Sequence, residues 1–303
     1  MLDAGCWKAG VGVNIGYATV VENARLYANT FVTWFRAPEL AHGAYPGQFL
    51  MLRCSDEASY STPDPASSIQ HPASASPPSS ILHPPSSVID ADPLLPRPMS
   101  YYGVRDGGNE WAILYDVVGR GTAWLSRRKP GDRVYCWGPL GRGYEVGKGS
   151  RNLLLVAGGI GIAPLVWLAD EAIAAGKNVT LVIGARSAEH VFPAQHLRPE
   201  VEVVVTTDDG SAGRKGFVTE PFGELLEWCD EAFACGPTPM FAAMAQVARK
   251  AKVRRPVQVL LEERMGCGTG ICYGCAVRVR ARGGQQTKLV CKDGPRFEIR
   301  EIW

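Results

Sequence analysis

The sequence is poor in long hydrophobic runs and has no excess of charge of one sign. No apolar run approaches the roughly 20 residues of a membrane-spanning helix, because glycines and a proline interrupt the longest candidate, 153–169. No basic stretch leads into an apolar core near the N-terminus, so no secretory signal is predicted. The formal net charge is only +2, without a long Lys/Arg run, which argues against nucleic acid as a partner. We therefore expect a cytoplasmic protein that binds neither membranes nor nucleic acids.

A disulfide framework is not indicated either, although the chain has nine cysteines. Four of them group near the C-terminus with the spacing Cys267-x4-Cys272-x2-Cys275, followed by Cys291. Three thiols on one tight loop with a distant fourth form the plant-type ferredoxin pattern, which holds a [2Fe–2S] cluster. Glycines between the first two cysteines allow the positive φ values that turn backbone amides toward anionic sulfurs. Clustered thiols of this kind suit a reducing compartment.

Zinc is the alternative ligand of the four cysteines. Structural zinc sites favour two arms with two cysteines on each, whereas here the arms carry three and one. The spacing therefore favours the iron–sulfur cluster and a chain that moves single electrons. The zinc alternative makes the chain a docking module without a redox role, and a colourless purified protein would support it.

The first half of the chain resembles a small β-protein with an interruption. Stretches rich in β-branched and aromatic residues predict strands over residues 12–22, 24–36, 48–53, 99–104, 111–118 and 131–137. A short helix is expected over 122–128. Nearly half of the residues in 55–96 are serine or proline, which predicts a disordered surface insertion. The short antiparallel strands suggest a Greek-key barrel over residues 11–146.

The second half alternates strands with helices. Strands are expected over 152–156, 178–184, 201–206 and 231–234, and helices through about 175 and over 221–228 and 238–252. This alternation predicts a doubly wound parallel sheet over residues 150–256. A further strand at 257–261 can close that sheet, and the cysteine module occupies 257–303. The expected fold class is thus multidomain, with an antiparallel β-barrel, a doubly wound parallel α/β domain and a small C-terminal cluster module.

Four motifs of the second half end strands of the predicted sheet. The first strand runs into Gly158-Gly159-Ile160-Gly161, where a strand, a glycine turn and a helix N-terminus can form a phosphate cradle. This is not the GxGxxG fingerprint, and by itself a glycine turn is equally a packing device. Because ligands collect at the carboxyl ends of strands in open α/β sheets, the shared placement predicts a dinucleotide site. Its expected residues are Gly158, Gly159, Gly161, Arg186, Cys235 and Gly236, with 206–210 nearby. Arg186 leaves the choice between NAD and NADP open.

Two motifs of the first half suggest a flavin site. Arg97-Pro98-Met99-Ser100 begins a predicted strand, and the planar fork of an arginine suits a pyrophosphate. Residues 114–122 pass from a strand through two glycines into a helix whose free N–H groups can receive a phosphate. Thr122 is expected both to cap that helix and to contact the ligand. Tyr115 either stacks on the ring system or is a strand aromatic.

In this order, the motifs resemble the ferredoxin–NADP reductase superfamily, whose members pair a flavin-binding β-barrel with a nicotinamide-binding α/β domain. Arg97-x-x-Ser100 looks like the family's flavin motif, with Met99 where many members have tyrosine. The cysteine module, 262–275 with 291–297, is similar to that of the electron-transfer subunits of type B dihydroorotate dehydrogenases. The resemblance implies that Cys267, Cys272, Cys275 and Cys291 hold the cluster. It also implies that FAD is lined by Arg97, Pro98, Met99, Ser100, Leu114, Tyr115, Asp116, Gly121 and Thr122.

The resemblance further implies an NAD-linked oxidoreductase subunit with no catalytic acid–base pair of its own. In such a subunit, electrons from dihydroorotate leave the FMN of a separate catalytic chain, cross the [2Fe–2S] cluster and FAD, and reduce NAD+ during pyrimidine biosynthesis. A heterotetramer with two copies of each chain is expected. The runner-up is a flavin/iron–sulfur subunit of another complex, such as a ferredoxin/NAD(P)H oxidoreductase or a sulfite reductase. Residues 291–295 favour the dihydroorotate assignment.

Overall fold

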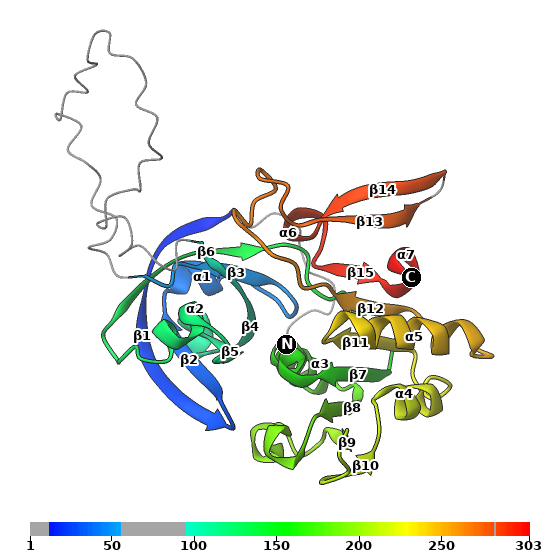
Figure 1. Ribbon diagram of the computed structural model, residues 1–303. Coiled ribbons are helices and arrows are strands. Elements are labelled where there is room, and N and C mark those ends of the chain that lie inside the picture. The colour runs from blue at the N-terminus through cyan, green and yellow to red at the C-terminus, as the bar shows by residue number, and fades with distance from the viewer. Residues whose placement is uncertain (1–11, 56–94, 282) are drawn as a thin grey trace, which may run out of the picture.

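The computed structural model describes residues 12–55, 95–281 and 283–303 (Figure 1). The segment 55–96, predicted to be a disordered insertion, lies almost entirely outside the described residues. A barrel built from the first half of the chain stands beside a large sheet built from the second half, and a β-hairpin projects at the far end. No helix in the described residues is long and apolar enough to cross a membrane.

Six antiparallel strands close the barrel in the order β1-β2-β5-β4-β3-β6. Their bounds are β1 (Asn14–Tyr27), β2 (Thr30–Arg36), β3 (Phe49–Leu52), β4 (Arg97–Arg105), β5 (Glu110–Asp116) and β6 (Arg133–Leu140). Two short helices, α1 (Pro38–Ala41) and α2 (Arg120–Leu125), accompany them. The interior is aromatic: Phe35 stacks on Trp111 with ring centroids 4.5 Å apart, and Tyr101 packs edge-on against Trp111. The predicted barrel is confirmed.

One predicted strand boundary is wrong. The sequence places a break at Asn23, but β1 continues to Tyr27 and the turn follows at residues 28–29. The side-chain amide of Asn23 donates hydrogen bonds to the carbonyls of Leu125, at 3.1 Å, and Arg128, at 2.8 Å. Because this polar side chain is satisfied across the barrel, asparagine here stays in the strand and anchors the end of α2.

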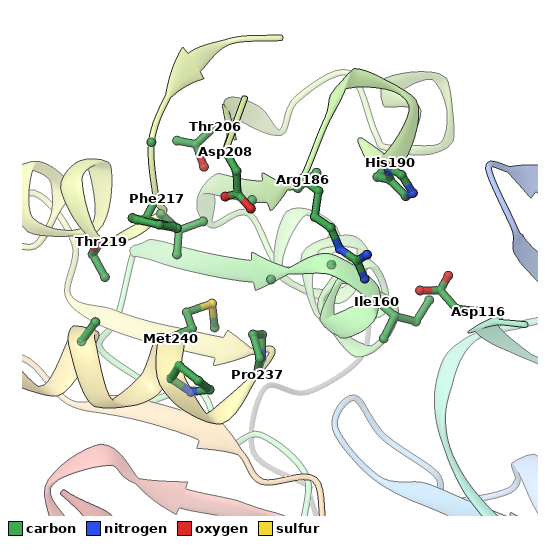
Figure 2. Close-up of a pocket in the computed structure, with 18 of the residues that line it drawn as sticks. Asp116, Ile160, Arg186, His190, Thr206, Asp208, Phe217, Thr219, Pro237 and Met240 are labelled. Carbon is green, nitrogen blue, oxygen red and sulfur yellow. The ribbon is translucent and has the colours of Figure 1, made fainter. Parts of the chain in front are cut away.

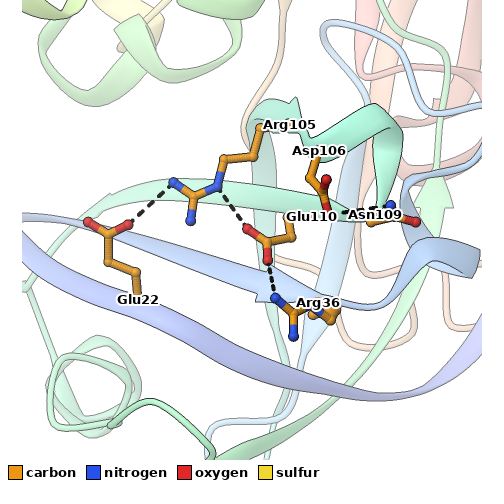
Figure 3. Close-up of polar contacts among 6 residues, drawn as sticks. All are labelled: Glu22, Arg36, Arg105, Asp106, Asn109 and Glu110. Carbon is orange, nitrogen blue, oxygen red and sulfur yellow. Dashed lines mark hydrogen bonds and ion pairs between the residues drawn. The ribbon is translucent and has the colours of Figure 1, made fainter.

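An ion-pair network ties four barrel strands together (Figure 3). The carboxylate of Glu110 on β5 accepts hydrogen bonds from Arg36 on β2, at 2.7 Å, and from Arg105 on β4, at 2.8 Å. Arg105 also pairs with Glu22 on β1, at 3.3 Å, and its guanidinium lies over the ring of Trp34. The hydrogen bonds from Arg105 and Arg36 hold the pKa of Glu110 below its usual range.

The second half forms a seven-stranded sheet in the order β10-β9-β8-β7-β11-β12-β15. Its strands are β7 (Asn152–Gly158), β8 (Asn178–Ala185), β9 (Glu202–Thr207), β10 (Arg214–Lys215), β11 (Glu231–Cys235), β12 (Val257–Leu260) and β15 (Arg296–Glu298). All neighbours are parallel except β12 and β15. The sequence analysis allowed residues 257–261 to close the sheet as its last strand. The sheet instead ends at β15, an antiparallel edge strand that the C-terminal module contributes.

Helices cover both faces of this sheet, as expected for a doubly wound domain. α3 (Ile162–Ala174) lies between the sheet and the barrel, where its buried residues share a core with Val32 and Leu114 of the barrel. α4 (Thr219–Leu225) and α5 (Thr238–Lys250) pack on the other face. The cysteine module adds the hairpin β13 (Ala276–Ala281) and β14 (Gly284–Leu289), α6 (Val290–Asp293) and α7 (Ile299–Ile302). The predicted fold class is confirmed.

Candidate functional site

A cavity of about 640 Å³ lies where β7, β8, β9 and β11 end, between the sheet and the barrel (Figure 2). The glycine turn after β7 forms its floor with Gly158, Gly159 and Ile160. Arg186 and Asp208 approach from the ends of β8 and β9. Further lining residues are Tyr27, Thr30, Asp116, His190, Thr206, Phe217, Thr219, Pro237 and Met240. A cleft at the carboxyl ends of parallel strands is where a dinucleotide binds in such sheets.

The six residues predicted to bind the dinucleotide divide into two groups. Gly158, Gly159 and Arg186 line the cavity. Gly161, Cys235 and Gly236 lie behind the wall, and a Cβ on Gly161 would clash with the carbonyl oxygen of Cys235. These residues let the turn after β7 pack closely against the turn after β11. The glycine turn is therefore both a cavity wall and a packing device.

Several cavity residues were missed because no local motif marks them. Tyr27 and Thr30 belong to the barrel, and they reach the cavity only because the barrel packs against the sheet. Asp116, predicted to line FAD, also faces this cavity, where its carboxylate accepts a 2.5 Å hydrogen bond from the hydroxyl of Thr30. Phe217 is 67% exposed and follows β10.

The flavin-type motifs meet at the start of α2. The guanidinium of Arg97 lies over Gly121, and a Cβ there would stand 3.1 Å from its Nε. The missing side chain of Gly121 thus makes room for the arginine beside a helix N-terminus, which suits an anionic phosphate. The N-cap residue is Gly119 and not Thr122, which takes part in capping from the third position of the helix. The hydroxyl oxygen of Thr122 accepts hydrogen bonds from the backbone N–H groups of Val118, at 3.0 Å, and Gly119, at 3.2 Å.

The side chain of Tyr115 turns into the barrel. It is 3% exposed, its ring stacks on Phe31, and its hydroxyl bonds to Thr33 and Asn23 at 3.3 and 3.4 Å. Burial raises the pKa of Tyr115 to about 12. Stacking of this ring on a flavin is therefore a wrong expectation, and Tyr115 is a strand aromatic. Leu114, the preceding residue, faces the core shared with the α/β domain.

On β4, Pro98 and Ser100 alternate with Met99. Met99 packs against the interior core of the barrel, so Pro98 and Ser100 point outward. All three are partly buried. Ser100 pairs with Phe49 of β3, and Pro98 pairs with Met51. The outer face of this strand therefore presents Pro98 and Ser100 next to Arg97.

Two of the four cysteines predicted as cluster ligands meet at the base of the hairpin. The sulfurs of Cys275 and Cys291 lie 3.2 Å apart, and both residues are buried. Burial and the neighbouring Cys275 sulfur raise the pKa of Cys291. Such a pair cannot ionise at low cost without a cation between its sulfurs. This environment fits a metal-bound pair of thiolates.

The other two cysteines lie on the exposed part of the loop. The sulfur of Cys267 accepts hydrogen bonds from the backbone N–H groups of Thr269, at 3.4 Å, and Cys272, at 3.5 Å. Burial opposes ionisation of Cys267, but these N–H groups outweigh it and lower its pKa to about 6. In the described part of the chain, no three His, Cys, Asp or Glu side chains converge as one metal ion requires. Two pairs of cysteines suit the two irons of a [2Fe–2S] cluster.

The molecule combines a flavin-type barrel, a nucleotide cavity and a ferredoxin-like loop with three cysteines, residues 267–275, which we call the cysteine loop. Together these features define an iron–sulfur flavoprotein oxidoreductase. The solved structure of an NADH-dependent reduced ferredoxin-NADP oxidoreductase, which performs flavin-based electron bifurcation, is similar over 94% of this chain and 89% of that chain. Its TM-score is 0.73 and its sequence identity 29%. A ferredoxin reductase of carbazole 1,9a-dioxygenase, at 22% identity and TM-score 0.61, covers 80% of this chain and 67% of that one and shares the fold.

Two family models match the chain. Residues 262–303 match the iron-sulfur cluster binding domain of dihydroorotate dehydrogenase B, and residues 155–246 match the oxidoreductase NAD-binding domain. The dihydroorotate dehydrogenase B (NAD(+)) electron transfer subunit of Desulforamulus reducens is 38% identical, over 89% of this chain and 90% of its own length. The subunit of the same name from Caldanaerobacter subterraneus subsp. tengcongensis is 35% identical, over 94% of this chain and 97% of its own.

The chain therefore belongs to the family of dihydroorotate dehydrogenase B electron transfer subunits. It is an NAD-linked oxidoreductase subunit whose cofactors are a [2Fe–2S] cluster, FAD and NAD. A subunit of this kind works with a catalytic partner.

Proposed function

We propose that this chain takes electrons from the FMN of a dihydroorotate dehydrogenase catalytic subunit and delivers them to NAD+, in the pathway that makes UMP. One observation carries the proposal: the strand with the flavin motif lies between the cysteine loop and the nucleotide cavity. On one edge, β4 pairs with β3, whose Met51 touches Gly268 of the loop. On the other edge it pairs with β5, which ends at Asp116 in the cavity wall.

The bound cofactors supply the redox chemistry: the cluster carries single electrons, the nicotinamide exchanges a hydride, and the flavin converts between the two. The work of the chain is to bind and orient them, so no acid–base pair is assigned. Arg97 and the amides at Gly121 and Thr122 hold the FAD phosphates. Pro98 and Ser100, with the backbone of Met99 and of 114–116, line the flavin.

The nicotinamide dinucleotide occupies the cavity over Gly158 and Gly159, with Arg186 beside it and Gly161, Cys235 and Gly236 shaping the wall. The four cysteines hold the cluster. We assign these tasks to three domains, 11–146 for FAD, 150–256 for NAD and 257–303 for the cluster. The placement of the cavity between barrel and sheet supports hydride transfer between a flavin on the barrel and a nicotinamide on the sheet.

The catalytic partner docks over the cysteine loop in this proposal. Ile271 and Tyr273 flank Cys272 and are 81% and 65% exposed, and large apolar side chains exposed next to one another mark interaction surfaces. Two copies of each chain form the complex. We place it in the cytoplasm, where cysteines without disulfide bonds, as all the described cysteines are, are expected. Hydrogen exchange that stays equally fast over residues 267–275 after the subunits are mixed would contradict this docking.

The function is tested anaerobically with the reconstituted chain and a dihydroorotate-oxidising FMN subunit from the same source. NADH should form after addition of dihydroorotate and NAD+, only with both chains present, and not with Cys272→Ser. A second candidate is suggested by the 29% identical ferredoxin-NADP oxidoreductase structure. If no NADH forms, but added NADH bleaches the flavin and reduces ferredoxin, that candidate replaces the proposed partner.

A further inference from the structure

The cysteine loop is bonded to the barrel through a tryptophan. The indole Nε1–H of Trp137, on β6, donates a hydrogen bond to the backbone carbonyl of Cys267 at 3.1 Å. Trp137 and Cys267 are separated by 130 positions in the sequence. Trp137 is partly buried and packs against the core that includes Cys275 and Cys291. The carbonyl of a cluster ligand is therefore held by a side chain of the flavin-type barrel.

Close packing fixes the next residue of the loop on the same strands. Gly268 has φ +72, and a Cβ there would stand 2.6 Å from Cγ of Met51 and 3.0 Å from Cδ1 of Leu140. Met51 is fully buried. The backbone after Cys267 thus lies directly on β3 and β6, and only glycine permits both the conformation and the approach.

The same strip of barrel leads to the flavin motif. Met51 is paired with Trp137 on β6 and with Pro98 on β4. Paired positions on neighbouring antiparallel strands present their side chains on the same face. Trp137, Met51 and Pro98 therefore form one row across the outer surface of the barrel, from the cluster ligand to the flavin motif.

We propose that Trp137 is a positioning residue that sets the reduction potential of the cluster, and this inference rests on the proposed function. Its hydrogen bond keeps the carbonyl of Cys267 directed at the barrel. In that orientation the following N–H groups, of Thr269 and Cys272, stay directed at the sulfur of Cys267. Hydrogen bonds to the sulfurs are among the features that set a cluster's potential, and they stabilise the more negative, reduced form.

The direct test is Trp137→Phe, which keeps an aromatic ring on β6 and removes the donor. Without the donor, the loop loses one neutral hydrogen bond. The net free energy of such a bond changes an equilibrium constant about threefold to tenfold. The cluster should therefore become harder to reduce by that factor, where tenfold corresponds to about 59 mV for a one-electron couple. The measurement is an anaerobic redox titration of the holoprotein followed by electron paramagnetic resonance.

Two further variants separate the hydrogen bond from the ring. Trp137→His keeps a ring N–H at a similar reach, so at pH 8 its potential should lie nearer the wild-type value than that of Trp137→Phe. Trp228→Phe removes a partly exposed indole that lines a groove with Lys177 and Glu202, and it should leave the potential unchanged.

The outcomes are distinct. The inference would be overturned if the reduction potential of Trp137→Phe were unchanged from wild type. It would also be overturned if Trp137→His or Trp228→Phe shifted the potential as much as Trp137→Phe does. So would failure of both position-137 variants to retain a cluster, since Trp137 would then be needed for assembly alone. If the Phe variant alone loses the cluster and the His variant holds it near the wild-type potential, the inference is supported. A wild-type chain that binds no [2Fe–2S] cluster would instead overturn the proposed function.

Discussion

The cysteine loop and the nucleotide cavity are built in opposite ways. Three of the four cysteines proposed as cluster ligands lie within 267–275, and the fourth, Cys291, is the second residue of the short helix after the hairpin. The cavity takes its walls from the ends of β7, β8, β9 and β11 and from Tyr27, Thr30 and Asp116 of the barrel. The proposed ligands are few and three of them are close in sequence, whereas the cavity residues are many and their arrangement depends on domain packing. Substitutions should therefore be severe in the first site and graded in the second.

The largest effect is expected from Cys275→Ser. Loss of a ligand thiolate should lower cluster affinity by at least the roughly 10- to 100-fold seen for groups that only support ligands. Iron content and visible absorbance of the purified protein measure this directly. The matched control is Cys229→Ala, which removes a fully buried thiol in the α/β domain and should leave the iron content unchanged.

Gly161→Ala tests whether the cavity wall depends on close backbone packing. The added methyl would clash with the carbonyl of Cys235, and overpacking of this kind costs about 1–3 kcal/mol. We expect a lower Tm and weaker NAD+ binding with full iron content, measured by thermal unfolding and titration. Gly149→Ala is the control, since a Cβ there meets nothing within 4 Å. Equal effects of the two variants would show that the turn tolerates a side chain.

Arg186→Ala should have a moderate effect confined to the cavity. Loss of one charge-assisted contact to a phosphate or ribose costs about 1.5–3 kcal/mol, so the KM for NAD+ should rise by about tenfold or more while kcat changes little. Arg198→Ala, which removes a guanidinium that pairs with Asp170 at 3.3 Å, is the control. If kcat fell as much as kcat/KM, Arg186 would act in hydride transfer rather than in binding.

Glu110→Gln touches neither site and should have the smallest effect. The folded-state pKa of Glu110 is lowered, so its contribution is present above the unfolded pKa and is lost as pH falls through the folded pKa. At pH 7 the variant should be less stable by about 1 kcal/mol, from weakened hydrogen bonds to Arg36 and Arg105. The difference from wild type should shrink in acid, as thermal unfolding between pH 7 and pH 3 would measure. A constant difference would mean that the charge of Glu110 contributes nothing.

The predictions that were confirmed rest on local patterns in the sequence. Strand and helix segments carry their own periodicity, so the barrel strands and the alternating sheet could be predicted with boundaries displaced by a few residues. The predictions for Asn23, Tyr115 and Thr122 were wrong in detail for one reason. Each polar group finds its partner within the fold, in the end of α2, in the barrel interior or in the backbone before the helix.

The cysteine spacing was enough to predict that the four proposed ligands belong to one module, because three of them share a loop and glycines define its conformation. The chemistry of the strand ends likewise pointed to Gly158, Gly159 and Arg186. Sequence could not reveal that Tyr27, Thr30 and Asp116 complete the cavity, nor that Trp137 and Met51 support the loop. Those residues belong to strands far away in the chain, and they reach the two sites only when the barrel closes and packs against the sheet, a consequence of burying one shared core.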